Sequence, residues 1–134
     1  QLSAKFPGSS LGATLAPPVA LSDGGKDLYI LQDKFHAQFA ADVPAKQARL
    51  MAASQRPITE AALNEASPAA AWKTLPSWFV YGEADRNIPA AAQAFMAKRA
   101  HARDTVVIKG ASHVVMVSHP DAVAALVEKA ALSR

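Results

Sequence analysis

Two short runs of β-favouring residues, each followed at once by a polar loop, constrain the fold of this chain more than any other feature. Residues 78–81 (WFVY) precede Gly82, and residues 106–108 (VVI) precede Gly110. Aromatic and β-branched side chains favour strands, and glycine favours the turn that ends a strand. Both runs are therefore predicted to be buried strands.

A helical pattern follows each of these strands. Asn87 is expected to cap a helix that begins near Pro89, in which Ala92 and Phe95 lie at helical spacing. Residues 118–121 (SHPD) resemble a capping box, and apolar residues continue at helical spacing behind them to residue 130. Residues 75–130 are thus predicted to form strand, helix, strand and helix.

One acid and one histidine lie in the loops after these two strands. Asp85 follows the first strand and His113 follows the second. Because parallel strands end at the same edge of a sheet, where ligands of open α/β sheets bind, the two side chains are expected to meet. A carboxylate bonded to one imidazole nitrogen fixes the tautomer and leaves the other nitrogen free as a base. Asp85 and His113 are therefore the candidate catalytic residues.

Length and composition exclude several classes of protein. A chain of 134 residues, 51% of them apolar, is expected to form one small α/β domain. The net charge of +3 is modest and no basic run interleaves with aromatics, so nucleic-acid binding is not expected. The chain has no Cys, which excludes disulfides and thiolate metal sites, and no metal or other cofactor is expected. Neither a membrane-spanning run nor a signal peptide is visible, which favours a cytoplasmic protein without membrane contact.

The two loop motifs resemble a known family. GEADRNIP at residues 82–89 and KGASHVVMVSHP at residues 109–120 are similar to the C-terminal part of an α/β-hydrolase of the small esterase and hydroxynitrile-lyase branch. The resemblance implies that Asp85 is the triad acid and His113 the general base, with ester hydrolysis or lyase chemistry as the activity. The alternative is that Asp85 caps the following helix and His113 is a loop histidine without a catalytic role.

The resemblance also implies a domain organisation. A complete α/β-hydrolase has roughly twice this length, so the resemblance covers its second half. Residues 1–8, in which Leu2, Ala4 and Phe6 alternate, would be the remnant of a core strand. Residues 9–71 would form a helical lid, and residues 72–134 the C-terminal strand-helix-strand-helix part of the core. The expected fold is therefore a partial α/β-hydrolase with about three parallel strands, flanking helices and a helical lid insertion.

Ser10 lies in a sequence, Gly8 to Gly12, that satisfies the G-x-S-x-G pattern of a nucleophile elbow. An elbow needs an apolar strand before it and a helix after it. Here Pro7 interrupts the strand, and Pro17 and Pro18 allow barely one helical turn. Ser10 is therefore kept only as an alternative nucleophile, and the nucleophile is expected to lie upstream of Gln1 or on another chain.

Apolar side chains of the predicted lid are the candidate contacts for a ligand. Phe35, Phe39 and Met51 could enclose an apolar acyl or alkyl group, since lids of this kind exclude water from a site. At helical spacing they could equally pack the lid onto the core.

Three functions remain open from the sequence. The chain supplies the Asp and His of an esterase triad and is inactive alone on small esters; it is a non-catalytic half-domain that binds or dimerises; or Ser10 makes it a miniature hydrolase. The first two predict a homodimer or a tight complex with a complementary chain that carries the nucleophile, because a sheet cut before its third-last strand exposes an edge and an apolar face.

Overall fold

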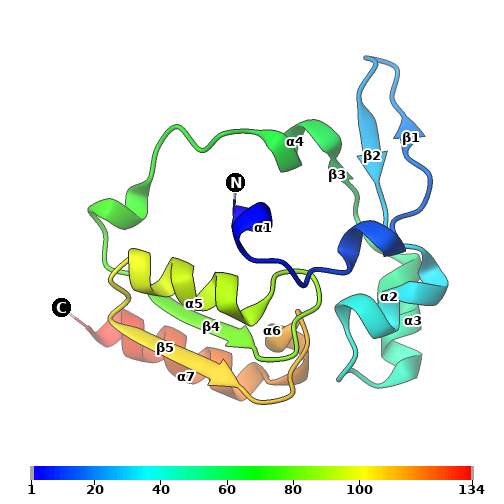
Figure 1. Ribbon diagram of the computed structural model, residues 1–134. Helices are drawn as coiled ribbons and strands as arrows, with labels where there is room; N and C mark the ends of the chain where they lie inside the picture. Colours follow the sequence, from blue (N-terminus) through cyan, green and yellow to red (C-terminus); the bar gives the residue numbers. More distant parts are fainter. Residues whose placement is uncertain (1, 134) are drawn as a thin grey trace.

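The computed structural model describes residues 2–133 and contains two separate sheets (Figure 1). In chain order the elements are α1 (Leu2–Lys5), η1 (Leu11–Thr14), β1 (Val19–Ala20), β2 (Lys26–Leu28), α2 (Gln32–Phe39), α3 (Ala45–Ala53), β3 (Ile58–Thr59), α4 (Glu60–Asn64), η2 (Ala71–Lys73), β4 (Trp78–Gly82), α5 (Ala90–Arg99), β5 (Asp104–Ile108), α6 (Val115–Ser118) and α7 (Pro120–Leu132). The predicted α/β class is confirmed.

Strands β4 and β5 form a parallel pair joined by α5. Their register places Trp78 opposite Asp104 and Gly82 opposite Ile108. Figure 1 shows α5 along one side of the pair and α7 along the other. The two loops that follow the strands therefore leave the sheet at the same edge, as the sequence predicts. In residues 2–133 this parallel sheet has two strands, where about three were expected.

The third expected strand is replaced by a turn of helix in residues 2–5. The amide of Phe6 donates to the carbonyl of Leu2 at 2.9 Å, so the alternating residues Leu2 and Phe6 lie one helical turn apart. The Phe6 ring packs on Phe95 of α5, with ring centroids 5.1 Å apart. A spacing of four residues satisfies a helical turn as well as a strand, and a lone strand without a hydrogen-bonded neighbour is not stable. Gln1, part of the predicted strand, lies outside the described residues.

The segment of residues 9–71 contains strands as well as the predicted helices. Strands β1, β2 and β3 form an antiparallel sheet in that order. The turn between β1 and β2 is closed by the amide of Leu21, which donates to Gly25 at 2.9 Å, and Gly24 has a positive φ of 85°. Each strand has only two or three residues, too few for an alternating pattern to show in the sequence.

The largest group of buried apolar side chains lies in the 9–71 segment, against α2 and α3. It consists of Ile30, Phe35, Ala40, Val43, Ala48, Ala52 and, from the C-terminal part, Val114. Strand β5 is only half buried along its length. The 9–71 segment therefore has a core of its own, which Val114 connects to the loop that carries His113.

Two helix starts differ from the predicted caps. Helix α7 begins after His119 without a side-chain cap, because Ser118 belongs to the short helix α6 and its hydroxyl donates to Val114 at 3.4 Å. Helix α5 begins after Pro89. The loop before it is held by Asp85 rather than capped by Asn87.

Candidate active site

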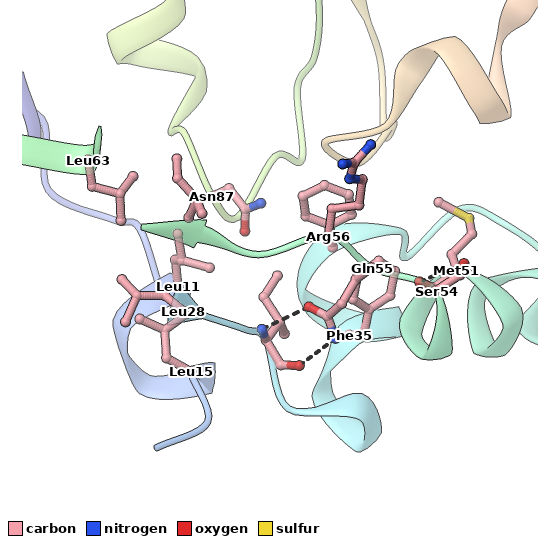
Figure 2. Close-up of a pocket in the computed structure, with 13 residues that line it drawn as sticks. Leu11, Leu15, Leu28, Phe35, Met51, Ser54, Gln55, Arg56, Leu63 and Asn87 are labelled. Atoms are coloured by element: carbon pink, nitrogen blue, oxygen red, sulfur yellow. Dashed lines mark hydrogen bonds between the residues drawn. The ribbon is translucent and has the colours of Figure 1, made fainter. Parts of the chain in front are cut away.

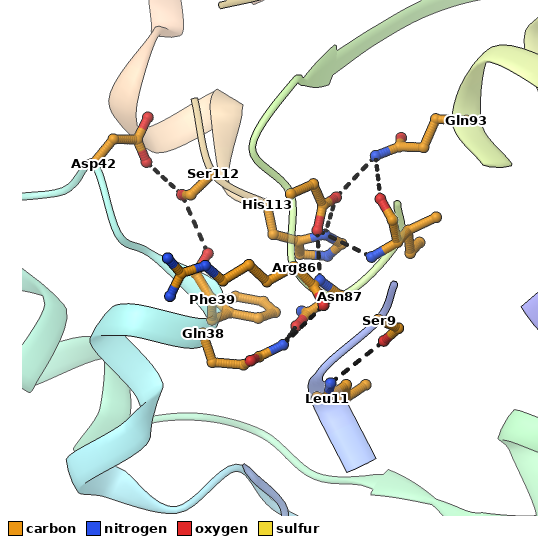
Figure 3. Close-up of polar contacts among 12 residues, drawn as sticks. Ser9, Leu11, Gln38, Phe39, Asp42, Arg86, Asn87, Gln93, Ser112 and His113 are labelled. Carbon is orange, nitrogen blue, oxygen red and sulfur yellow. Dashed lines mark hydrogen bonds and ion pairs between the residues drawn. The ribbon is translucent and has the colours of Figure 1, made fainter. Parts of the chain in front are cut away.

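Asp85 and His113 meet at the edge of the parallel sheet, and Figure 3 shows His113 with the polar side chains around it. His113 Nδ1 lies 2.8 Å from Asp85 Oδ2. The Asp85 side chain is 2% exposed and that of His113 is 29% exposed. The loops after β4 and β5 thus place a buried carboxylate against an imidazole that solvent or a ligand can reach.

Each oxygen of the Asp85 carboxylate has two hydrogen-bond partners in the protein. Oδ1 accepts the backbone amides of Asn87 at 2.8 Å and Ile88 at 3.0 Å. Oδ2 also accepts a hydrogen bond from the Gln93 side chain at 2.8 Å. An ionised carboxylate only accepts, so Nδ1 of His113 carries the proton that joins them. Nε2 of the neutral ring is then a free base.

These contacts decide the acidity of Asp85. Burial on its own raises the pKa of Asp85. The hydrogen bond from His113, the amide of Ile88, the charge of His113 and the amide of Asn87 together outweigh burial and hold the pKa of this carboxyl below its ordinary value. Asp85 is therefore ionised at neutral pH.

The stability of the fold is expected to fall as the pH drops through about 4, in part because of Asp85. An aspartate in an unfolded chain has a pKa of about 3.9. The pKa of Asp85 in the folded chain is lower, so the unfolded chain takes up this proton first as the pH falls. The stabilisation is present above the unfolded pKa and is lost as the pH falls through the folded pKa. Urea unfolding from about pH 3 to about pH 7 tests this: Asp85→Asn should cost about 1–3 kcal/mol at neutral pH and should flatten the acid slope.

Asp104 gives a comparison at the surface. The hydrogen bond from Lys129, followed by the amide of Thr105, holds the pKa of Asp104 below its ordinary value. Because water and salt screen exposed pairs, Asp104→Asn should change the pH dependence less than Asp85→Asn does. The reverse order would contradict the assignment of acid sensitivity to the Asp85 contact.

Gly82, the last residue of β4, allows the two loops to approach. A β-carbon at this position would lie 2.7 Å from the carbonyl carbon of Ala111, and closer still to the backbone oxygens of Ala111 and Ser112. The amide of Ala84 donates to the carbonyl of Ala111 at 3.0 Å. Only glycine leaves room for the backbone before His113 to lie directly against the start of the Asp85 loop.

Helix α2 is hydrogen-bonded to the loop that carries Asp85. The buried Gln38 side chain donates to the Arg86 carbonyl at 3.0 Å and to Asn87 Oδ1 at 2.7 Å. The Arg86 guanidinium donates in return to the carbonyl of Ala37 at 3.0 Å. The ring of Phe39, at the end of the same helix, packs against His113 with centroids 4.8 Å apart.

A second polar cluster joins the 9–71 segment to the histidine loop. The hydroxyl of Ser112, the residue before His113, donates to Asp42 Oδ1 and lies 3.3 Å from the Phe39 carbonyl. Burial raises the pKa of Asp42, but polar contacts, the hydrogen bond from Ser112 first among them, outweigh it and lower the pKa overall. His119 Nε2 lies 3.4 Å from Asp42 Oδ2 without hydrogen-bonding geometry. Asp42 therefore holds the loop of His113 mainly through Ser112.

Ser10 lies at the N-cap of η1 and its hydroxyl donates to Gln38 Oε1 at 2.7 Å. In residues 2–133 no strand precedes Ser10, and no serine is hydrogen-bonded to His113 Nε2. The structure therefore brings Asp85 and His113 together but does not bring Ser10 into a hydrogen bond with them.

A cavity of about 420 Å³ is lined by side chains of the 9–71 segment and by Asn87 (Figure 2). Phe35, Phe39 and Met51, the three predicted ligand contacts, all line it. Asn87, from the loop of Asp85, lines it as well. Phe39 and Asn87 therefore each contact both the cavity and the acid–histidine pair.

Three polar residues of the site were not predicted from the sequence. Gln93 is eight residues after Asp85 and faces back from the first turn of α5. Asp42 precedes the sequence Val43-Pro44, a pattern typical of a helix start rather than of a site. Gln38 is buried, and its position between Phe35 and Phe39 at helical spacing is the one local sequence signal of a polar role.

In the described part of the chain, no cluster of three or more His, Asp or Glu side chains could bind a metal ion. None of the helices formed by residues 2–133 is both long and apolar enough to cross a bilayer.

A model of a known protein family shows to which family the chain is related. The profile of the Alpha/beta hydrolase family matches residues 3–126. The chain belongs to this family. The match includes both loops of the Asp85–His113 pair and the whole 9–71 segment of this alpha/beta hydrolase. No curated protein matches the sequence.

Solved structures with a similar fold include an esterase. The crystal structure of polyneuridine aldehyde esterase matches with a TM-score of 0.74 and 16% identity over 96% of this chain and 52% of that chain. A mutant of the same esterase matches with a TM-score of 0.73 and 15% identity over 94% of this chain and 52% of that chain. The alpha/beta hydrolase chain thus spans about half the length of these structures and shares their fold.

Proposed function

We propose that Asp85 and His113 are the acid and the general base of a Ser-His-Asp triad that hydrolyses small carboxylic esters. The observation that carries the proposal is the 2.8 Å contact between the buried Asp85 carboxylate and Nδ1 of His113. This contact fixes the tautomer in which Nε2 accepts a proton. Membership of the alpha/beta hydrolase family supports the same assignment.

The reaction follows from these two roles. A serine oxygen adds to the ester carbonyl carbon while its proton passes to His113 Nε2, and the alcohol leaves with that proton. Water then attacks the acyl-serine, again giving a proton to Nε2, which returns it to the serine as the carboxylic acid leaves. Asp85 remains ionised throughout and stabilises the imidazolium.

We place the nucleophile outside residues 2–133, on a preceding segment or on a partner chain. The hydroxyl of Ser10 is bonded to Gln38, and no strand leads into it. Without a nucleophile nearly all of the covalent route is lost, so residues 2–133 alone should be a very poor esterase.

The cavity beside the pair would hold the apolar part of the ester. Phe35, Phe39 and Met51 line it, and the Phe39 ring also packs on His113. A cavity of about 420 Å³ is within the range that encloses small ligands. Phe39 would thus lie between the part of the cavity that holds the apolar group of the ester and the position of its reacting carbonyl beside His113.

A second candidate function is association with another chain. Among the described residues β4 pairs only with β5, and exposed apolar side chains lie on β5 and α7, including Val107 (48%), Val127 (61%) and Leu132 (84%). Unpaired strand edges and apolar surface favour pairing with a second polypeptide. A homodimer or a complex with a complementary chain is the proposed assembly.

One sample tests both candidates by light scattering, fluorophosphonate labelling and nitrogen NMR. We expect an associated species, no labelled serine, and a His113 ring protonated at Nδ1 and unprotonated at Nε2. A label on Ser10 would contradict an external nucleophile. The opposite tautomer of His113 would contradict its role as the base, and a monodisperse monomer at micromolar concentration would contradict association.

A further inference from the structure

The cavity beside the candidate active site is mainly apolar, but its polar side chains are not equivalent. Four polar side chains line this cavity: Ser54, Gln55, Arg56 and Asn87. The hydroxyl of Ser54 donates to the Leu50 carbonyl at 2.8 Å. The amide of Gln55 is bonded to the backbone: Oε1 accepts from Ile30 at 2.9 Å, and Nε2 donates to Ile30 at 2.8 Å and to Ala52 at 3.1 Å. Neither side chain therefore has an N–H or O–H left to donate to a ligand.

The two remaining polar side chains, Arg56 and Asn87, offer hydrogen-bond donors. No carboxylate of residues 2–133 lies within 4.0 Å of the Arg56 guanidinium. Asn87 Oδ1 accepts from Gln38, which leaves the Nδ2 group as the free end of the amide. Figure 2 shows both side chains at the cavity, which also contains Leu11, Leu15 and Leu28. The side-chain N–H groups of this lining that have no partner among residues 2–133 belong to Arg56 and Asn87, so the apolar cavity is suited to a ligand that brings an acceptor.

Because the Arg56 side chain is positively charged, it favours a ligand whose acceptor is an anion. A guanidinium keeps its charge at any physiological pH and binds a carboxylate through two parallel hydrogen bonds. We propose that the cavity selects esters that carry a free carboxylate at the end of an apolar chain, with Arg56 binding the carboxylate and the apolar side chains enclosing the chain. This proposal rests on the proposed esterase function and names its substrate class.

The positions of the contacts agree with such a ligand. Phe39 lines the cavity and packs on His113, and the backbone amide of Asn87, whose side chain lines the cavity, donates to Asp85. A chain held by Arg56 can therefore direct its ester end past Phe39 toward His113. Arg56 would then decide which esters bind, without touching the reacting atoms.

The test uses two probes that differ only in the charged end. Monomethyl suberate carries one carboxylate and one methyl ester, and dimethyl suberate carries two methyl esters. In NMR titrations of the 134-residue chain, the monoester should bind about tenfold more tightly than the diester, and added salt should reduce this preference. Arg56→Gln should abolish the preference while the diester affinity stays the same.

Arg49 supplies the matched control. It is an exposed arginine of α3 that does not line the cavity, so Arg49→Gln should keep the preference for the monoester. Equal binding of both probes to the unmodified chain, or a preference that survives in Arg56→Gln, would overturn the proposal. Arg56 has no ion pair among the described residues, so its replacement should leave thermal unfolding unchanged, which circular dichroism checks.

His113→Ala separates this inference from the proposed function. The titrations measure binding alone, so the preference for the monoester should persist in His113→Ala. Loss of the preference in that variant would overturn the placement of the carboxylate at Arg56. Arg56-dependent binding, together with hydrolysis that does not depend on His113, would refute the esterase mechanism and leave the selectivity of the cavity standing.

Discussion

Replacing His113 by alanine is expected to lower kcat for ester hydrolysis by about 10⁶-fold in any form of this protein that includes the nucleophile. His113 is the only general base in the proposal, and without it neither the serine nor the attacking water loses its proton. Asp85→Asn should cost about 10⁴-fold, because an asparagine in that position holds the wrong tautomer of the ring. Steady-state kinetics with a p-nitrophenyl ester measure both effects.

Two measurements distinguish a loss of catalysis in His113→Ala from a loss of folding. The KM should change much less than kcat, since His113 lies beside the cavity and does not line it. His101→Asn is the matched control: His101 is exposed and has a positive φ of 49°, which asparagine tolerates. A loss of activity in His101→Asn as large as that in His113→Ala would contradict the assignment.

Replacing Gly82 by alanine is expected to destabilise the fold by about 3 kcal/mol, the upper end of what overpacking usually costs. The added methyl would overlap the backbone oxygens of Ala111 and Ser112, and backbone cannot move aside as the end of a flexible side chain can. The loop of His113 must therefore shift away from β4, and the contact between His113 and Asp85 should break. Chemical denaturation measures the first effect, and the proton on His113 Nδ1 reports the second by NMR.

Gly12→Ala is the control for this change. A β-carbon at Gly12 would meet no atom within 4 Å, so this variant should be as stable as the unmodified chain or more so. If Gly82→Ala unfolded at the same denaturant concentration as Gly12→Ala, and retained the NMR signal of the Asp85–His113 contact, the two loops would not depend on the glycine.

The sequence predicted those parts of the fold in which local pattern and topology agree. Apolar runs before Gly82 and Gly110 predict both parallel strands, and their order predicts that Asp85 and His113 lie at one sheet edge, as the structure has them. The reason is that a parallel crossover leaves little freedom in where the following loops emerge. The catalytic roles of Asp85 and His113 remain predictions.

The remainder depends on contacts that are distant in the sequence. Asp42 reaches Ser112 across 70 residues and Gln38 reaches Asn87 across 49, and neither distance leaves a periodic trace. The N-terminal segment shows a different difficulty: its alternating residues satisfy either a strand or a helical turn, and packing of Phe6 on Phe95 accompanies the helix. Patterns shorter than about two turns do not distinguish these states.

Helix α2 contacts both loops of the candidate site, and this has a consequence for how a ligand gains access. Gln38 binds the loop of Asp85, the Phe39 carbonyl lies 3.3 Å from the Ser112 hydroxyl, and the Phe39 ring packs on His113. Lifting α2 would break all of these contacts together, so an open conformation would leave the loops of Asp85 and His113 without the support of this helix. Entry of a ligand by rotation of side chains at the cavity mouth keeps the pair intact. Helix α2 thus both covers the site and supports the two loops that form it.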